Sequence, residues 1–323
     1  MVNAPTRALF EFHRITRPEE IPLADENAID VAILDMNHGW PNVGHDAIAR
    51  AVANAATTLA PELHERGLMV RALSYEVRQH RMIPETPGPR FHLYLGTGGP
   101  GHLDPRENDA ASIGSQGIRE NPEWENPLFE LFDAILADEE AALLAVCHTF
   151  GVICRWSGAA EPRLRETKSR GIRENELTAA ALEHPWFRRF ASELPDGRRF
   201  SVMDSRLYDL APTGNSSAML LAFESDRALT MLELARDREG VIPRVFGVNH
   251  HPEIVDRNYI MSILDEKRGR GEVTPEWYEE RAHALTEHYS PEKDAQIRLT
   301  AEYTFLRPLQ FHLERILRLK CNG

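Results

Sequence analysis

The sequence predicts an α/β fold in which a mostly parallel sheet carries helices on both faces, followed by a helical C-terminal extension. Two observations support this prediction. Short apolar runs alternate with segments of helical periodicity, and the runs are apolar at successive positions rather than at every second one. Strands of that kind are buried on both faces, which is typical of a parallel sheet covered on two sides.

The elements can be assigned in chain order. Each strand prediction rests on a short apolar run that ends in a turn-rich or glycine-rich stretch, and each helix prediction rests on apolar residues three or four positions apart. In the helix after Pro127 these positions are Leu128, Leu131, Phe132, Ile135 and Leu136. The predicted strands span 29–36, 67–77, 90–101 and 142–147, and the predicted helices span 46–63 and 126–136.

The alternation stops in the second half of the chain. Residues 157–199 are polar and rich in charge, and we interpret them as an excursion over the edge of the sheet. Short apolar runs at close spacing between 199 and 254 then predict hairpins that return to the sheet. These changes divide the chain into an N-terminal extension (1–28), a main domain (29–254) and a helical extension (255–323).

The last predicted helix has one apolar face, formed by Leu306, Leu309, Leu313, Ile316 and Leu317, and Pro308 is expected to bend it. A stripe of this kind shows only that something covers it. The tail can pack on its own domain, or it can form a dimer or partner contact.

Composition limits the classes of function. The chain has 323 residues, 42% of them hydrophobic and 27% charged, as expected of a globular protein with a full core. Its formal charge of -13 argues against broad affinity for nucleic acid or for an anionic membrane. No apolar run is long enough to cross a bilayer, and the first residues lack the apolar core of a secretory signal. We therefore expect a cytoplasmic protein with a small or neutral partner.

The cysteines and histidines predict neither a disulfide framework nor a metal site. Three cysteines, Cys147, Cys154 and Cys321, are expected to be reduced thiols. The histidine spacings do not match a metal-ligand pattern, since His250 and His251 are adjacent. No bound metal and no cofactor are expected.

Three chemically suggestive stretches each follow an apolar strand: the glycine turn 98–101, Cys147, and the run from His251 to Glu253. In an open parallel sheet, functional residues gather at the carboxyl ends of the strands. A thiol on a turn that leads into a helix is exposed, and a histidine with a nearby carboxylate can exchange its proton. Each stretch alone is common as a buried thiol, a turn or a solvated loop, but their order along the chain predicts a Cys-His-Glu triad.

Glycine turns also bring backbone N–H groups close to a reacting carbonyl. Gly98 and Gly99 are therefore candidates for an oxyanion hole, together with the amide of His148, the residue after the nucleophile.

These stretches, "LYLGTGGPG", "LLAVCHTFG" and "VFGVNHHPEI", resemble the three signature blocks of the class I, triad-type glutamine amidotransferases. The resemblance covers about 29–254, and the last block is its most specific part. It implies a flavodoxin-like sheet with Cys147 as nucleophile, His251 as general base and acid, and Glu253 as the residue that orients it. The implied reaction is hydrolysis of a carboxamide through a thioester.

The sequence departs from that pattern after the nucleophile. Family members usually have glycine two residues after the cysteine and glutamine four after it, where this chain has Thr149 and Gly151. The family's substrate contacts therefore do not carry over, and the amide substrate need not be free glutamine. Thr149 and Arg206 are candidate substrate-binding residues, Arg206 as a partner for a substrate carboxylate. The His148 side chain can line the pocket or turn to solvent.

Three functions remain open. The first is a cysteine-dependent amide hydrolase, either supplying ammonia to a separate synthase or releasing its product. The second is a binding or regulatory protein on the same scaffold, and the third is an acyltransferase that uses the same thioester. A synthase and a second copy of the chain are both possible protein partners.

Overall fold

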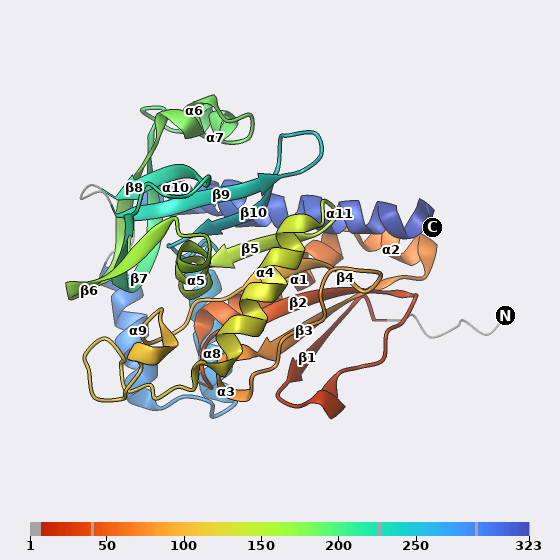
Figure 1. Cartoon of the computed structure of the whole chain (residues 1–323), viewed down its shortest axis with the longest axis horizontal. Coiled ribbons are helices and arrows are strands. Elements are labelled where there is room, and N and C mark those ends of the chain that lie inside the picture. The colour runs from red at the N-terminus through yellow and green to blue at the C-terminus, as the bar shows by residue number, and fades with distance from the viewer. Residues whose placement is uncertain (1–7, 40–41, 225–227, 288–289, 323) are drawn as a thin grey trace.

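The computed structural model describes residues 8–39, 42–224, 228–287 and 290–322. Within these residues the strands form one ten-stranded sheet in the order β1-β3-β2-β4-β5-β10-β9-β8-β6-β7 (Figure 1). The strands are β1 (Phe10–Ile15), β2 (Ala28–Asp35), β3 (Met69–Glu76), β4 (Phe91–Gly96), β5 (Ala142–Val146), β6 (Ala160–Leu177), β7 (Arg199–Pro212), β8 (Met219–Glu224), β9 (Leu229–Arg236) and β10 (Pro243–Val248).

Helices connect and cover the strands. The α-helices are α1 (Val43–Thr58), α2 (Ala60–Arg66), α3 (Val77–His80), α4 (Glu125–Ala137), α5 (His148–Trp156), α6 (Ala179–Glu183), α7 (Phe187–Glu193), α8 (Arg257–Gly269), α9 (Pro275–Glu287), α10 (Pro291–Ala301) and α11 (Arg307–Asn322). Short 3-10 turns lie at Pro18–Glu20, Pro105–Glu107 and Pro122–Trp124, and a π-helical turn lies at Glu302–Leu306.

The sheet has a parallel half and an antiparallel half. Strands β1, β3, β2, β4, β5 and β10 are parallel neighbours, whereas β10, β9, β8, β6 and β7 pair in antiparallel fashion. Numbered along the chain without β1, the parallel strands follow the order 2-1-3-4-5, which is the flavodoxin-like order. The predicted α/β fold with a mostly parallel, flavodoxin-like sheet is confirmed.

Both faces of the parallel half are buried because its strands are apolar at successive positions. In β2, Val31 and Ile33 pack in one core cluster with α1, α2 and α11, whereas Ala32 and Leu34 pack in a second cluster with α4 and α5. Figure 1 shows α4 in front of the sheet and α11 behind it.

The C-terminal helix packs on its own sheet. Leu309, Leu313, Ile316 and Leu317 of α11 join the same core cluster as α1, as one of the two interpretations of the apolar stripe predicts. The bend at Pro308 remains a prediction, and a π-helical turn at Glu302–Leu306 ends two residues before the proline. A π turn accommodates the backbone carbonyl that proline leaves without a donor.

The prediction for residues 157–199 was wrong in part. The polar passage contains the longest strand of the described chain, β6, which pairs along most of its length with β7. Most of its side chains are exposed or half-buried and many are charged. The strand therefore shows neither a continuous apolar run nor a regular alternation of apolar and polar residues. The N-terminal extension also contributes to the sheet, because β1 pairs in parallel with β3 at its edge.

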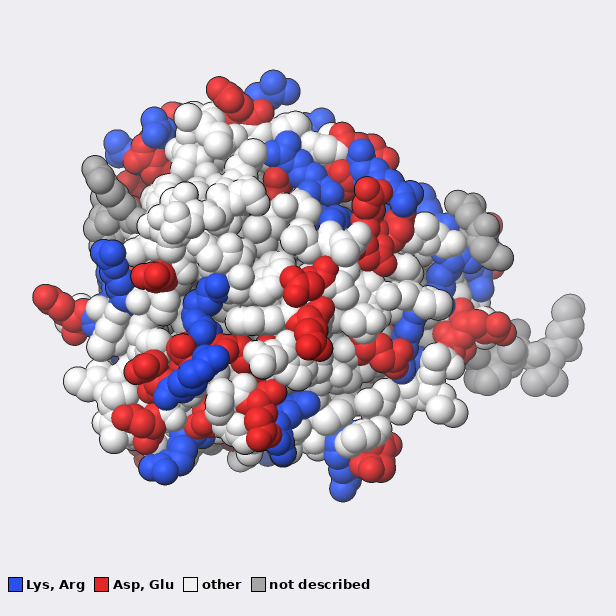
Figure 2. Space-filling model, viewed as in Figure 1, with Lys and Arg blue, Asp and Glu red and all other residues white. Residues whose placement is uncertain are grey.

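Charges of both signs cover the surface. On the face in Figure 2, acidic and basic side chains are interspersed instead of forming one basic field. None of the helices in the described ranges combines the length and the apolar character that a bilayer span requires.

Candidate active site

Cys147 occupies a strained turn between β5 and α5. Its backbone has φ 49° and ψ -98°, a positive φ that a residue with a side chain rarely adopts. Its amide donates to the carbonyl of Val248 at 2.8 Å, which fixes the turn to the end of β10. This is the geometry of a nucleophile elbow, in which a sharp strand-to-helix turn exposes the reactive side chain.

Glycines elsewhere provide the space that the elbow needs. A Cβ at Gly96, the last residue of β4, would collide with the side chain of Thr149. A Cβ at Gly151 would collide with Leu103, which lines the cavity described below. The absence of a side chain at Gly96 thus leaves room for Thr149, and Leu103 fills the space above Gly151.

The close contact between Gly96 and Thr149 predicts that substitutions at these two positions have coupled effects on stability. We expect Gly96→Ala to lower the free energy of unfolding by about 1–3 kcal/mol, because the added methyl group overpacks the elbow. In a Thr149→Gly background the same substitution should cost less. Denaturant unfolding of the four proteins of this cycle measures the coupling, and equal costs in both backgrounds would contradict the packing account.

His251 and Glu253 follow β10 and contact one another. Nδ1 of His251 lies 2.8 Å from Oε1 of Glu253, and both side chains are buried. Burial disfavours the imidazolium, but the charges of Glu253 and Cys147, with hydrogen bonds to both, raise the pKa of His251 well above its usual value. The structure therefore brings the sulfur, the imidazole and the carboxylate together in one chain of contacts.

The glycine turn after β4 lies against the same group. A Cβ at Gly98 would lie 3.0 Å from Cε1 of His251, which is a tight contact, and 3.8 Å from Sγ of Cys147, which is an ordinary one. A Cβ at Gly99 would collide with the carbonyl oxygen of Met36. Glycine thus lets the turn lie close to His251 and Cys147 at Gly98, and close to Met36 at Gly99.

His148 is buried and lines the cavity, so its side chain is not turned to solvent. Burial, with the nearby charge of Arg78, lowers its pKa well below the usual value, while an interaction with the backbone of Gly99 opposes the shift. Its imidazole is therefore neutral at pH 7. Nε2 has no hydrogen-bond partner among the described residues.

The two candidate substrate-binding residues are held by the protein itself. Thr149 is buried, and its hydroxyl donates to the carbonyl of Thr97 at 2.8 Å. Arg206 is buried among three carboxylates: it pairs with Glu224, lies 3.3 Å from Asp209, and has Asp204 at 3.6 Å. The charge of Arg206 is thus balanced within the protein, and its proposed role with a substrate carboxylate remains a prediction.

A cavity of about 300 Å³ lies over Cys147, His148 and His251. Pockets of this size hold small organic ligands. The C-terminal extension forms part of its wall, through Leu264 of α8 and Trp277 of α9. The extension therefore belongs to the site.

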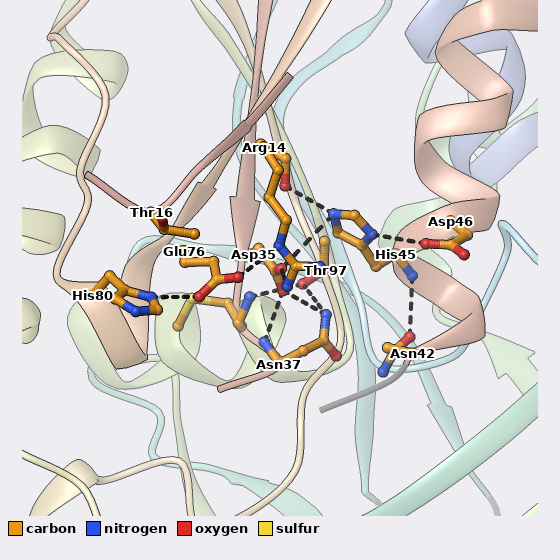
Figure 3. A network of polar contacts seen from close by, with 12 residues as sticks. Arg14, Thr16, Asp35, Asn37, Asn42, His45, Asp46, Glu76, His80 and Thr97 are labelled. Carbon is orange, nitrogen blue, oxygen red and sulfur yellow. Dashed lines mark hydrogen bonds and ion pairs between the residues drawn. The ribbon is translucent and has the colours of Figure 1, made fainter. Parts of the chain in front are cut away.

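A polar network supports the glycine turn from the β1 side (Figure 3). Its members Asp35, Asn37, Glu76 and Thr97 are buried, whereas Arg14 is exposed. Arg14 of β1 donates to Glu76 at 2.6 Å and lies 3.4 Å from Asp35. Asp35 accepts the side-chain amide of Asn37 at 2.6 Å, and that amide also lies 3.4 Å from the hydroxyl of Thr97. Because Thr97 directly precedes Gly98, the network fixes the start of the turn.

A second contact clamps the other end of the turn. Arg78 donates to the carbonyls of Met36 at 2.8 Å and Pro100 at 2.6 Å, and it pairs with Glu120 at 2.6 and 2.7 Å. Both side chains of this pair are 0% exposed. The sequence does not predict this pair, because no local pattern links residues 42 positions apart.

The described residues include no group of three or more histidine, cysteine, aspartate or glutamate side chains arranged to hold a metal ion. The side chain of Cys321 lies outside the described residues, whereas Cys147 and Cys154 are both free thiols.

No family model and no curated protein matches the chain. Among solved structures, a glutamine amidotransferase from Thermotoga maritima is 15% identical, with a TM-score of 0.49 and coverage of 90% of this chain and 98% of that one. A glutamine amido transferase from Methylobacillus flagellatus is 13% identical, with a TM-score of 0.48 and coverage of 89% of this chain and 95% of that one. Likenesses this low transfer no activity or substrate to this chain, and the fold assignment rests on the strand order above.

Proposed function

We propose that the protein is a cysteine-dependent amide hydrolase of the glutamine amidotransferase-like kind. The observation that carries the proposal is the chain of contacts from Cys147 through His251 to Glu253, which starts at a strained elbow and opens into a cavity. Such a group supplies a nucleophile, a proton carrier and a residue that orients the carrier.

The reaction follows from these positions. The Cys147 thiolate attacks the amide carbonyl carbon, and the backbone amides of Gly99 and His148 are the proposed donors to the oxyanion. The imidazolium of His251 gives its proton to the leaving nitrogen as the C–N bond breaks, which leaves a thioester on Cys147. Neutral His251 then takes a proton from water as the water attacks the thioester, and the acid is released. Glu253 holds Nδ1 of His251 throughout.

The cavity bears on the identity of the substrate. Leu103 occupies the space above Gly151, and the wall includes side chains of α8 and α9. The site therefore differs around the acyl group from one with a glutamine side chain four residues after the nucleophile. We propose an amide other than free glutamine as the substrate.

Intact-protein mass spectrometry tests this function. The protein is incubated with a panel of amides, including glutamine and N-substituted amides, and quenched in acid. We expect at least one amide to add the mass of its acyl group to the wild-type protein and to Cys154→Ala, whose altered thiol is buried away from the cavity. Cys147→Ala should show no adduct.

An adduct of equal yield in Cys147→Ala would exclude the proposed nucleophile. If no amide gives an adduct, while Cys147→Ala and the wild type bind one of them equally well, the binding-protein function would replace the hydrolase.

A further inference from the structure

Lys168 of β6 is a cation without a partner in the candidate active site. Its side chain is half-buried and lines the same cavity as Cys147. In the described ranges it makes no hydrogen bond or ion pair, although other buried cations do: Lys267, for example, lies 2.8 Å from Asp46. Burial, with the charges of Arg170 and Arg281, lowers the pKa of Lys168, and the charges of Cys147 and Glu280 offset this shift only in part.

The neighbouring charges add to this excess. Arg170 and Arg281 also line the cavity, and both pair with the same carboxylate, Glu280, at 3.1 and 3.5 Å. Glu280 is thus shared by two arginines, and Lys168 adds a third cation at this end of the cavity. An excess of positive charge beside low-dielectric walls concentrates anions.

Part of the cavity wall is apolar. Ile260 and Leu264 of α8 and Trp277 of α9 line the cavity, and the guanidinium of Arg281 lies 4.0 Å from the centre of the Trp277 ring. The Trp277 ring therefore places an apolar surface directly beside the positive charge of Arg281. The cavity therefore combines a cationic end with an apolar wall.

We infer that Lys168 binds an anionic group of the substrate, a carboxylate or a phosphate, and that the apolar wall receives a hydrophobic part of the same molecule. The inference rests on the proposed function in naming the substrate as an amide. The substrate class is an amphipathic anionic amide, larger and more apolar than glutamine. Lys168 is a specificity-determining residue in this assignment, and Arg281 contributes from the rim.

Alkylation of Cys147 tests the anion subsite without requiring turnover. Second-order rates are measured with iodoacetate, which is anionic, and with iodoacetamide, which is neutral, and labelling at Cys147 is scored by peptide mass mapping. We expect the iodoacetate-to-iodoacetamide rate ratio to fall about tenfold in Lys168→Met, because a charge-assisted hydrogen bond to the carboxylate is lost. Lys168→Arg should keep most of the wild-type ratio, and Lys293→Met, which removes an exposed lysine, should not change it.

The neutral reagent separates the two possible actions of Lys168. If the lysine only stabilised the Cys147 thiolate, both rates would fall together and the ratio would not change, which would overturn the inference. A normal iodoacetamide rate in Lys168→Met also shows that the variant is folded at the site.

Protection experiments identify the anion and test the apolar wall. We expect hexanoate or hexyl phosphate to slow iodoacetamide labelling of the wild type at concentrations where acetate and hexanol do not, and to lose this effect in Lys168→Met. Whichever of the two anions protects more identifies the group. Equal protection by hexanol would overturn the anionic part, and equal protection by acetate would overturn the apolar part.

The outcomes also separate this inference from the proposed function. A ratio that depends on Lys168 in a protein that forms no acyl adduct would retain the anion subsite and reject the hydrolase. If an acyl adduct forms but the iodoacetate-to-iodoacetamide rate ratio is unchanged in Lys168→Met, the hydrolase would be retained and the anion subsite rejected.

Discussion

Arg78→Met is expected to lower the free energy of unfolding by about 3–5 kcal/mol and to abolish most of the reactivity at Cys147. The substitution leaves the Glu120 carboxylate buried without its cation, although Asn108 and Trp124 still donate to it at 2.8 and 3.0 Å. It also removes the donor that joins Met36 to Pro100. The glycine turn then loses its clamp beside the proposed oxyanion hole.

Arg71→Met is the matched control. Arg71 lies on β3 and pairs with Asp30 at 2.7 and 2.8 Å, so its loss also breaks a buried ion pair. It is distant from the glycine turn, because Asp30 lies near the start of β2 whereas the turn follows the end of β4. Arg90 still pairs with Asp30 at 2.8 Å in Arg71→Met. We therefore expect Arg71→Met to lose less stability in urea than Arg78→Met, and we expect a loss of acyl-adduct formation per folded molecule only in Arg78→Met.

A double variant keeps this prediction testable if the single variant is too unstable. Arg78→Met with Glu120→Gln removes the uncompensated charge and should recover part of the stability, but not the adduct formation. Full adduct formation in the folded double variant would contradict the role of the clamp in positioning the turn.

The strands that carry the site could be predicted because burial leaves a local pattern. The run from Ala142 to Val146 is apolar at every position, since both of its faces are covered, and the chemistry begins where the run ends at Cys147. The same reasoning locates the run before His251. In a parallel sheet the carboxyl ends of such strands share one edge. Predicting the strands therefore also predicted that Cys147 and His251 lie near one another.

The other parts of the site have no such pattern. β6 is a polar strand stabilised by cross-strand pairing with β7, and Lys168 was therefore assigned to an excursion instead of to the cavity. Arg78 and Glu120 meet only through the tertiary fold. The contribution of α8 and α9 to the cavity wall likewise depends on how these helices pack in the tertiary structure. It could not be predicted, because an amphipathic stripe does not identify what it covers.

Glu253→Gln is expected to reduce turnover of the amide identified by the adduct experiment by roughly 10³- to 10⁴-fold, with little change in the fold. The carboxylate lies 2.8 Å from Nδ1 of His251, and among the residues that raise the pKa of this histidine its charge has the largest effect. Glutamine keeps the shape but loses the charge, so the imidazolium is less stable and the tautomer is no longer fixed. Asp256→Asn is the matched control, because Asp256 caps α8 and asparagine can cap it too. Turnover of Asp256→Asn should stay within a few-fold of wild type.

The same substitution should change how stability depends on pH. The folded-state pKa of His251 lies above its unfolded value near 6.5, so its stabilising contribution is complete below about pH 6.5 and is lost as the pH rises through the folded-state pKa. The difference in unfolding free energy between wild type and Glu253→Gln should therefore be larger at about pH 6 than at about pH 9. Urea unfolding at both pH values measures it. A difference that grows toward high pH would mean that Glu253 does not stabilise an imidazolium, and His251 would then lack the proton that the leaving nitrogen requires.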